Sequence, residues 1–316
     1  MRFSLKVSII VPTYNRAHLV TETIDSILAQ TFKDFELIVI DNESGDNTEE
    51  VIRSYTDERI RYFRHQNNGL VAVNRNYGIS KANGEYIAFC DDDDLWMPEK
   101  LERQVKLLDL NKELGLVYSN SYIMDANGNL ERDTLLSKSK LFRGNVFDKL
   151  FQGNFIPMLT VVIRREVLSK VGGFSPKYII AQDYDLWLRI AEYYPIDFTE
   201  EPLAKYRIHG GSASRNLELV IKEGFQLIEY WLEKKANSER GFRGKAKQKQ
   251  ANLHVSLIVY YLRNHHNQKA ISESVNLVKL FPYSLVVVPM VVAKLRRVLN
   301  PRRNSAGRMQ CLTKGI

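Results

Sequence analysis

Short apolar runs alternate with polar, helix-like segments along the first ninety residues of the chain. Four of these runs have the length and β-branched content of buried strands: residues 7–11, 35–40, 60–63 and 86–90. The segments between them favour helices: residues 18–30, 48–55 and 71–81. Strands that alternate with helices form parallel βαβ units. The pattern therefore predicts an α/β fold with a mostly parallel central sheet flanked by helices.

The alternation loosens after residue 90. Further elements are expected as strands at 115–118, 158–163 and 203–208, helices at 98–111 and 184–192, and a hairpin turn at 125–128. From residue 217 the pattern is helical, with helices expected at 217–235, 251–264 and 268–280 and a basic linker after the first. We therefore expect an α/β domain at residues 1–215 and a helical C-terminal region with a basic tail at residues 216–316.

Polar residues follow three of the predicted strands at the point where each strand ends. Residues 12–14 follow the first strand, residues 41–42 follow the second, and residues 91–94 follow the strand at 86–90. In open α/β sheets ligands bind beyond the carboxyl ends of the strands. We therefore expect these three segments to meet in one cleft.

The run Asp91–Asp94 is the sharpest chemical signal in the sequence. Four adjacent carboxylates repel one another and disfavour full ionisation unless a cation is close. Hard oxygen ligands of this kind suit Mg²⁺ or Mn²⁺, which complete their coordination with water and substrate phosphate. A solvated acidic run is the alternative, but this one lies between a buried strand and Leu95-Trp96. We therefore favour a site for a metal ion and a diphosphate.

The composition excludes several classes of protein. The chain has 316 residues, of which 44% are hydrophobic and 26% charged, so neither a disordered nor a fibrous protein is expected. Two cysteines, Cys90 and Cys311, cannot form a disulfide scaffold or a CxxC zinc site, and they favour a reducing compartment. The longest apolar stretch, residues 285–293, contains Pro289 and is too short to span a bilayer. No signal peptide is expected.

The net charge of +8 arises in the tail rather than in the folded body. After Glu273 the sequence has no acidic residue and eight basic ones, which account for the whole excess. The body is thus neutral, and we expect no nucleic-acid partner.

A series of segments, each weak alone, together resembles family 2 glycosyltransferases. They are Val7–Arg16, Gln30–Phe32, Glu36–Asp46, Asn74–Gly78, Asp91–Asp94, Gln182–Arg189 and Tyr206–Ser212. The resemblance covers about residues 5–215. It implies the Rossmann-like GT-A fold and transfer of a sugar from a nucleotide-diphosphosugar to an acceptor hydroxyl, with inversion at the anomeric carbon.

The resemblance also implies how the donor is bound. The first loop, with Pro12, Thr13 and Tyr14, packs around the nucleotide base, and an aromatic ring is available to stack on it. Asn42 stands where the family usually has an Asp that hydrogen-bonds the base, so the choice of base stays open. Asp41 beside it either contacts the donor or caps the turn that follows.

Further donor and metal residues are carried over in the same way. Arg75 matches an arginine that faces the donor and pairs with the acidic run or with the diphosphate, and the alternative is a solvated helix arginine. Asp91-Asp92-Asp93 matches the family's D-x-D motif, with Asp92 near the donor's ribose and sugar and Asp93 as the metal ligand. We expect Asp94 to cap a helix.

Two residues complete the expected site. Asp183 matches the family's catalytic base, which takes the proton of the acceptor hydroxyl, and its structural alternative is the N-cap of the helix at 184–192. The family often has Glu before this base, whereas this chain has Gln182. His209 matches a position that reaches the metal or the diphosphate, and the alternative is a structural histidine.

The sequence therefore predicts an inverting, Mn²⁺- or Mg²⁺-dependent glycosyltransferase. A glycan or lipid-linked glycan of the bacterial cell surface is the expected acceptor by analogy, with its contacts in residues 122–157. An inactive nucleotide-sugar-binding protein is the alternative. A nucleotidyltransferase is disfavoured because residues 12–16 contain no glycine.

The C-terminal tail suggests where the protein works. An apolar segment at residues 283–293 is followed at once by Lys294, Arg296 and Arg297. This arrangement is typical of a segment lying in an anionic membrane surface. We expect a cytoplasmic protein held peripherally at the inner face of the plasma membrane. The alternative is a core helix followed by an unstructured basic tail.

Overall fold

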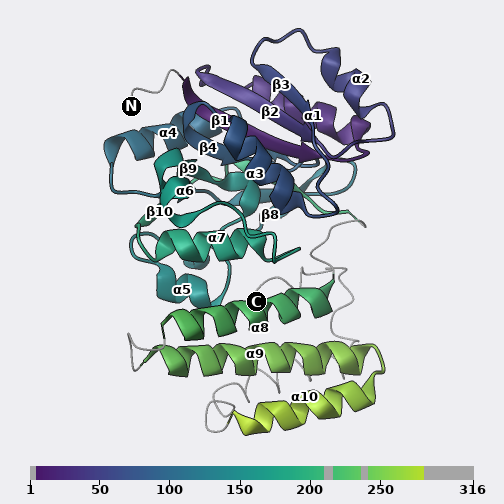
Figure 1. Cartoon of the computed structure of the whole chain (residues 1–316), viewed down its shortest axis with the longest axis vertical. Coiled ribbons are helices and arrows are strands. Elements are labelled where there is room, and N and C mark those ends of the chain that lie inside the picture. The colour runs from purple at the N-terminus through teal and green to yellow at the C-terminus, as the bar shows by residue number, and fades with distance from the viewer. Residues whose placement is uncertain (1–4, 210–215, 236–240, 281–316) are drawn as a thin grey trace. The chain divides into compact units, whose positions relative to one another are not determined.

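The computed structural model describes residues 5–209, 216–235 and 241–280. The chain divides into two compact units, residues 1–212 and 213–316 (Figure 1). The domain boundary predicted between residues 215 and 216 stays a prediction, because it adjoins residues outside the described ones.

The first unit is built on a central sheet with the strand order β10-β6-β9-β4-β1-β2-β3. These strands are β10 (Ile196–Phe198), β6 (Leu116–Tyr118), β9 (Val162–Arg164), β4 (Gly84–Phe89), β1 (Leu5–Thr13), β2 (Phe35–Asp41) and β3 (Ile60–Arg64). All pairings in this sheet are parallel except those of β9, which runs antiparallel to both neighbours. The predicted α/β class and the mostly parallel sheet are therefore confirmed.

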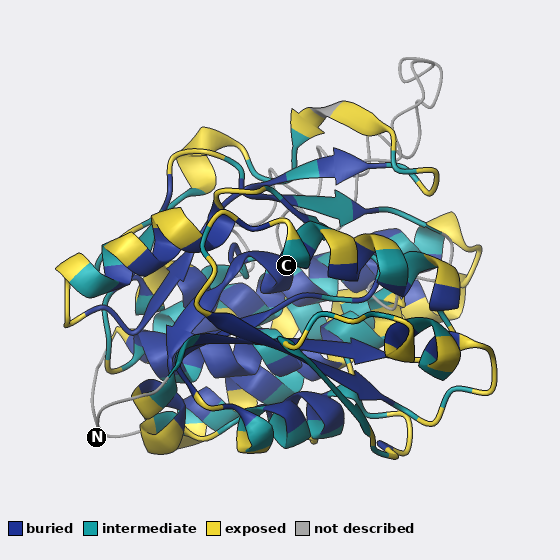
Figure 2. Cartoon of the chain, turned by 90° about the horizontal axis from the view of Figure 1, so that it is seen from above, coloured by how far each residue is buried: buried dark blue, intermediate teal, exposed yellow. Residues whose placement is uncertain are grey.

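The helices of this unit connect and cover the strands (Figure 1). They are α1 (Ala17–Leu28), α2 (Thr48–Arg53), α3 (Val71–Lys81), α4 (Lys100–Leu110), α5 (Phe147–Gln152), α6 (Arg165–Val171) and α7 (Gln182–Ala191), with short 3₁₀ turns at Lys138–Lys140 and Met158–Thr160. Figure 2 shows the central strands as buried and the outer faces of the helices as exposed. The sheet is thus the middle layer of the unit.

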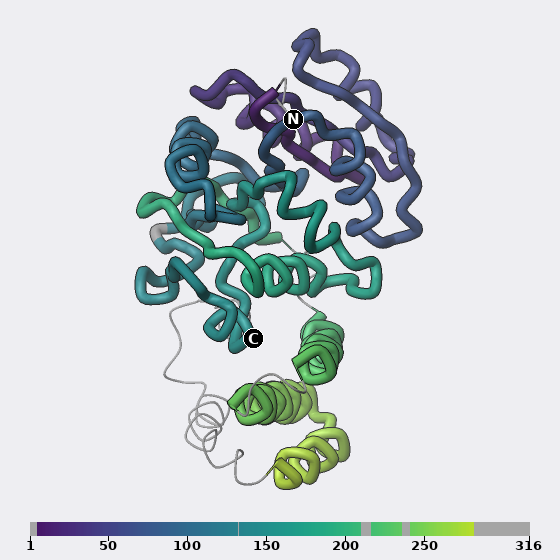
Figure 3. The backbone as a smooth tube through the Cα atoms, turned by 60° about the vertical axis from the view of Figure 1, so that its left-hand side comes forward, coloured from purple at the N-terminus to yellow at the C-terminus, as the bar shows by residue number. Residues whose placement is uncertain are grey.

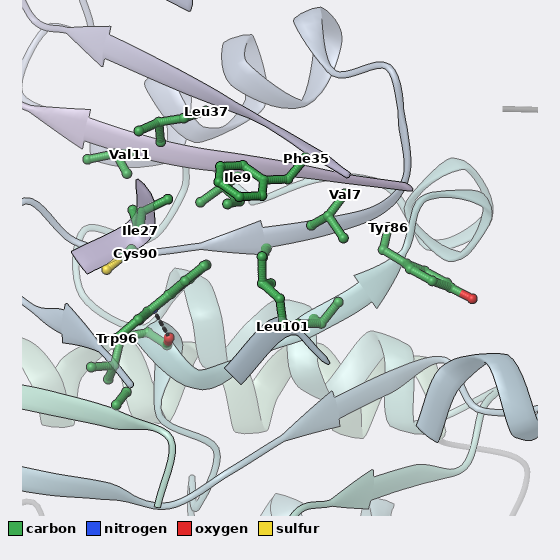
Figure 4. Packing of buried hydrophobic residues seen from close by; sticks show 14 of the residues in the cluster. Val7, Ile9, Val11, Ile27, Phe35, Leu37, Tyr86, Cys90, Trp96 and Leu101 are labelled. Atoms are coloured by element: carbon green, nitrogen blue, oxygen red, sulfur yellow. Dashed lines mark hydrogen bonds between the residues drawn. The ribbon is translucent and has the colours of Figure 1, made fainter. Parts of the chain in front are cut away.

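Alternate residues of the central strands face opposite layers. Val7, Ile9 and Val11 of β1 join a cluster that includes Ile27 of α1 and Leu101 of α4 (Figure 4). On the other face, Ile10 lies so close to α3 that a Cβ on Gly78 would come within 2.6 Å of its side chain. Both faces of the sheet are therefore buried, which explains why its strands read as continuous apolar runs.

A second, smaller sheet was not predicted. It has the order β5-β11-β7-β8, with β5 (Leu95–Trp96), β11 (Ala204–Arg207), β7 (Ser121–Met124) and β8 (Leu130–Thr134). The hairpin turn predicted at residues 125–128 joins β7 to β8, and Gly128 takes a positive φ of 83° there. The sheet matters for function because β5 directly follows the acidic run and β11 ends two residues before His209.

Three other predictions need correction. The strand expected at residues 158–163 is a 3₁₀ turn followed by β9, which starts at Val162. The basic linker expected before residue 251 is partly helical, because α9 begins at Phe242. Helix α7 begins at Gln182, two residues before the predicted start.

The second unit contains three helices among its described residues, α8 (Leu217–Lys234), α9 (Phe242–Arg263) and α10 (Asn267–Lys279). Figure 3 shows α9 between α8 and α10, and Ala251 and Val255 of α9 pack against Leu277 and Leu280. No helix in the described part of the chain is long and apolar enough to cross a membrane. The tail prediction falls on residues 281–316, outside the described residues.

Candidate active site

The carboxyl ends of β1, β2 and β4 bring the predicted loops together. Thr13 lies opposite Asp41 in the parallel register of β1 and β2, and the Asn42 amide donates to the Thr13 carbonyl oxygen at 2.9 Å. On the other side, the Thr13 hydroxyl donates to Asp92 Oδ2 at 2.8 Å. The three segments predicted to meet therefore do meet, at one edge of the sheet.

Asp92 is the buried residue of the D-x-D motif, and its side chain is held by several hydrogen bonds. Its side chain accepts hydrogen bonds from the Thr13 hydroxyl, from Arg16 Nη1 at 2.8 Å and from the Tyr14 amide at 3.4 Å. The pKa of Asp92 is raised to about 6. Burial is the main cause, the charge of Arg16 opposes the rise, and the negative charge of Asp93 contributes to it. Arg16 had no role in the sequence analysis, although it ends the first motif.

Asp93 and His209 are in direct contact. His209 Nε2 lies 2.7 Å from Asp93 Oδ2, and Arg16 Nη1 donates to the same oxygen at 2.6 Å. The two residues predicted as metal ligands are thus brought together from positions that are distant in sequence. A carboxylate oxygen suits both Mn²⁺ and Mg²⁺, and an imidazole nitrogen suits a transition-metal ion such as Mn²⁺ better than Mg²⁺.

Arg75 pairs with the first residue of the acidic run. It is 6% exposed, its Nη2 donates to Asp91 Oδ1 at 2.5 Å, and its guanidinium lies over the Phe174 ring. The alternative of a solvated helix arginine is therefore wrong, and the predicted pairing with the acidic run is confirmed. Its buried Nε has no hydrogen-bond partner among the described residues. Such a donor is costly to leave unpaired.

Asp94 does not cap a helix, so that prediction was wrong. Helix α4 starts only at Lys100, whereas Asp94 Oδ1 accepts from the Arg207 amide at 2.9 Å. The side chain is 1% exposed, and burial raises its pKa well above the ordinary value. Asp94 thus fastens the acidic run to β11 of the second sheet.

Arg207 reinforces this attachment and was missed by sequence reasoning. Its Nε donates to the Asp93 carbonyl oxygen at 2.7 Å, and its other nitrogens donate to Glu22 of α1 and to the Ala126 carbonyl oxygen. The residue is 2% exposed. Because His209 follows two residues later, Arg207 also holds that histidine beside the acidic run. The only sequence signal was its place in the motif that ends at Ser212.

The other residues predicted to bind the donor differ in their exposure. Asp41 is fully buried, and its carboxylate accepts from Ser44 and from the Tyr62 hydroxyl, which agrees with the turn-cap alternative. Asn42 uses its side-chain oxygen to accept from the Asn67 amide. By contrast, Tyr14 is 53% exposed beside Asp92.

Pro12 lies within β1 and is buried. It therefore belongs to the strand that leads into the first loop. A contact between Pro12, Thr13 or Tyr14 and a nucleotide base stays a prediction, as does one from Asp41 or Asn42.

Asp183 lies in the first turn of α7 rather than at its N-cap, which is Ala181. Its Oδ1 accepts from the Tyr184 amide at 2.6 Å, and Asn154 Nδ2 lies 3.4 Å from its Oδ2. Burial raises the pKa of Asp183 to about 6; the charge of Arg75 opposes this rise and that of Asp91 adds to it. The Arg75–Asp91 pair thus acts electrostatically on the Asp183 carboxylate, and the place of Asp183 in the same site stays a prediction.

No group of three or more His, Cys, Asp and Glu side chains in the described ranges is gathered as a ready-made metal cage. Magnesium and manganese sites that bind substrate phosphates do not need one, because one or two protein ligands suffice. Asp93 and His209, which are in contact, could supply two such ligands. The residues at this edge of the sheet therefore fit a divalent ion shared with a phosphate-bearing substrate.

Comparison with known proteins identifies glycosyltransferases as relatives of this chain. The model of the family "Glycosyl transferase family 2" matches residues 8–172. An uncharacterized glycosyltransferase of Methanocaldococcus jannaschii is 34% identical over 236 residues, which cover 72% of this chain and 80% of that protein. An uncharacterized glycosyltransferase of Rickettsia felis is 36% identical over 218 residues, but the match spans 67% of this chain and only 35% of that relative.

A further relative carries a named activity. The Escherichia coli protein WfgD, named a UDP-Glc:alpha-D-GlcNAc-diphosphoundecaprenol beta-1,3-glucosyltransferase, is 31% identical over 229 residues, covering 72% of this chain and 87% of that protein.

Solved structures agree with the expected fold. S. aureus TarS 1–349 in complex with UDP-GlcNAc superposes with a TM-score of 0.66 at 18% identity, covering 95% of this chain and 92% of that one. The mannosyltransferase PcManGT from Pyrobaculum calidifontis, in complex with GDP-Man and Mn²⁺, gives a TM-score of 0.60 at 17% identity, with 97% and 92% covered. The predicted GT-A fold is confirmed.

Proposed function

Because the chain belongs to glycosyl transferase family 2 and is a glycosyltransferase, we propose that it moves a sugar from a nucleotide-diphosphosugar to an acceptor hydroxyl with inversion. The observation that carries this proposal is the proximity of two arrays. The D-x-D motif is held by Thr13, Arg16 and His209, and Asp183 lies within electrostatic reach of the Arg75–Asp91 pair.

The donor's nucleotide and diphosphate are proposed to bind along the ends of β1, β2 and β4. Tyr14 offers an exposed ring for stacking on the base. Arg75 supports a diphosphate contact, because its buried Nε is unpaired in the described part of the chain and would gain an anionic partner. Asp91 holds that guanidinium beside the acidic run by accepting a hydrogen bond from its Nη2.

Asp93 and His209 are proposed to hold the divalent ion, Mn²⁺ or Mg²⁺. When bound, this ion would stabilise the negative charge of the departing diphosphate. Arg207 and Asp94 keep the two ligands together, because they tie the acidic run to the strand that leads to His209.

Asp183 is proposed as the base. The acceptor oxygen forms a bond to the anomeric carbon, the bond from that carbon to the diphosphate breaks, and the acceptor's proton passes to Asp183 Oδ. The Tyr184 amide and Asn154 hold the carboxylate by donating to it. A pKa of about 6 leaves the carboxylate mostly ionised at neutral pH but still basic enough to take the proton.

A donor screen tests this proposal directly. The purified chain is incubated with UDP-, GDP-, dTDP- and CDP-sugars and Mn²⁺, and thermal stabilisation and the release of free nucleotide are measured. We expect one nucleotide to stabilise the protein and to be released as the diphosphate. An inactive binding protein would be stabilised without any release. A nucleotidyltransferase would release no nucleoside diphosphate; with added pyrophosphate it would convert the nucleotide sugar to a nucleoside triphosphate and a sugar 1-phosphate.

We predict that turnover falls as the pH drops through about 6. The pKa of Asp183 is raised to this region, and only the ionised base is active, so activity is present above it and lost below it. At saturating donor and metal, kcat should fall about tenfold per pH unit on the acid side. The residual activity of Asp183→Asn is the control, because it should lose this inflection. A wild-type profile that stays flat down to about pH 4.5 would contradict the role of Asp183 as base.

The acceptor is proposed to be a glycan, in particular a lipid-linked one, of the bacterial cell surface. The supporting observation is the similarity to WfgD, whose name gives a diphosphoundecaprenol-linked sugar as its acceptor. A lipid-linked acceptor would place this chain at the inner face of the plasma membrane, in the cytoplasm.

We predict that the basic tail provides this membrane attachment. The chain after Glu273 carries eight basic residues and no acidic one, and each cation near an anionic surface contributes about 1 kcal/mol. Full-length protein should sediment with phosphatidylglycerol vesicles at low salt and be released by added salt, whereas a chain ending at Pro282 should stay in solution. Equal sedimentation of both chains, or binding that ignores salt, would contradict the electrostatic anchor.

A further inference from the structure

Arg16 occupies a defined position at the start of α1. It is the residue before Ala17, and the preceding Asn15 takes a positive φ of 50°. Asn15 is fixed to the β2–α2 loop, because its side-chain oxygen accepts from the Gly45 amide at 2.7 Å and its amide donates to the Ser44 hydroxyl at 2.9 Å. The backbone that carries Arg16 is therefore held in place, and only the side chain is left to move.

A single nitrogen of Arg16 bridges two carboxylates. Its Nη1 lies 2.8 Å from Asp92 Oδ1 and 2.6 Å from Asp93 Oδ2. The second of these oxygens is also the one in contact with His209 Nε2. The guanidinium thus uses the oxygen that the proposed function assigns to the divalent ion.

Arg16 is the arginine at this edge of the sheet with the most freedom to leave. Its side chain is 30% exposed, compared with 7% for Arg75 and 2% for Arg207. Arg207 is also tied to two backbone carbonyl oxygens, and Arg75 lies over the Phe174 ring. Within the described residues, the Arg16 guanidinium makes one hydrogen bond to Asp92 and one to Asp93.

A divalent ion bound at Asp93 Oδ2 would lie close to the Arg16 guanidinium, which donates to the same oxygen. Their like charges repel steeply in a partly buried site, where the effective dielectric constant is far below that of water. Binding of the ion at Asp93 must therefore include the cost of breaking the charge-assisted hydrogen bond from Arg16 to Asp93 Oδ2.

We propose that Arg16 is a resident counter-cation that competes with the divalent ion for Asp93 and is displaced from this carboxylate when the ion binds. This inference rests on the proposed metal site. It assigns Arg16 a task that the transfer reaction itself does not need. The side chain neutralises the acidic run in the free protein, and it keeps the metal affinity low until a donor diphosphate adds its own ligands.

The test measures Mn²⁺ binding to the free, full-length protein by calorimetry. Arg16→Met removes the competing charge and keeps the length of the stem, so we expect it to bind Mn²⁺ about tenfold more tightly than the wild type, the equivalent of one charge-assisted hydrogen bond. Arg53→Met is the matched control, because Arg53 is exposed and pairs with Glu49 on α2. It should bind Mn²⁺ as the wild type does.

The outcomes separate this inference from the proposed function. Equal or weaker Mn²⁺ binding by Arg16→Met would overturn the competition. Absence of Mn²⁺ binding in all three proteins, with and without nucleoside diphosphate, would overturn the proposed metal site and this inference with it.

A second measurement covers the case in which Arg16→Met does not fold. The side-chain Nε–H signal of Arg16 in wild-type protein is assigned by nuclear magnetic resonance through its loss in Arg16→Lys, which keeps the charge. Saturating Mg²⁺ should shift this signal and leave that of Arg207 in place. An Arg16 signal that does not respond to Mg²⁺ would overturn displacement.

Discussion

Asp183→Asn should lower turnover by about 10²-fold or more, the usual contribution of a positioned general base. The substitution keeps the size of the side chain but removes the carboxylate that would take the acceptor's proton. Donor affinity should stay within about twofold of the wild type, because the contacts proposed for the donor lie on Tyr14, Arg75 and the acidic run. Steady-state transfer and donor binding by calorimetry are measured on the same protein.

The matched control for this variant is Asp34→Asn, at an exposed position before β2. It makes the same chemical change away from the site and should leave turnover unchanged. Transfer by Asp183→Asn within a few-fold of wild type would show that Asp183 is not the base.

Asp93→Ala should abolish the metal-dependent part of donor binding. The oxygen it removes is the one that contacts His209 and Arg16. Loss of one of two protein ligands should cost at least tenfold in metal affinity by order of magnitude. The affinity for UDP or GDP is measured with and without Mn²⁺.

Asp34→Ala is the corresponding control and should keep the full metal effect. If Asp93→Ala shows the same gain in affinity on adding Mn²⁺ as the wild type, Asp93 is not a metal ligand. The role of His209 as a metal ligand would then also have to be withdrawn, because its contact with the acidic run is to Asp93.

The sequence predicted the parts of the fold whose patterns are local. The strands β1, β2 and β4 are buried on both faces, so each appears as a mainly apolar run, and their ends were placed within two residues. Helix α3 was predicted with the bounds it has, Val71–Lys81. These elements carry Thr13, Asp92 and Arg75, which is why the meeting of the three loops could be predicted.

The second sheet could not be predicted because its strands are short and their partners are distant. Strand β11 pairs with β5 and β7, which lie about a hundred and about eighty residues earlier in the chain. The wrong assignment of Asp94 as a helix cap follows from this gap. The strand itself was expected at residues 203–208, but nothing in the sequence indicated that it would lie beside the acidic run with the Arg207 amide as the partner of Asp94.

The error at α9 has a different cause. Residues 243–250 are rich in Lys, Arg and Gln, so they were taken as a basic linker. These residues are good helix formers, and packing of Phe242 and Ala246 in the interior of the second unit fixes the helix from its first turn. Composition alone could not distinguish a basic linker from a basic helix face.

The roles of arginines depend on tertiary contacts and were only partly predictable. Arg75 was expected near the donor from the resemblance, and its pairing with Asp91 agrees with that. Arg16 and Arg207 carried no such expectation, because their contacts with the acidic run join residues about seventy-five and about a hundred and fourteen positions apart. Only the folded chain shows that three guanidiniums surround the run.

The central claim is that this chain transfers a sugar with inversion, using Asp183 as the base. The most direct measurement is product analysis by nuclear magnetic resonance, with the donor identified in the nucleotide-sugar screen, Mn²⁺ and a lipid-linked glycan acceptor. We expect one nucleoside diphosphate released per glycoside formed, the opposite anomeric configuration in product and donor, and loss of both signals with Asp183→Asn. A product that retains the donor's configuration, or wild-type yields from Asp183→Asn, would contradict the account.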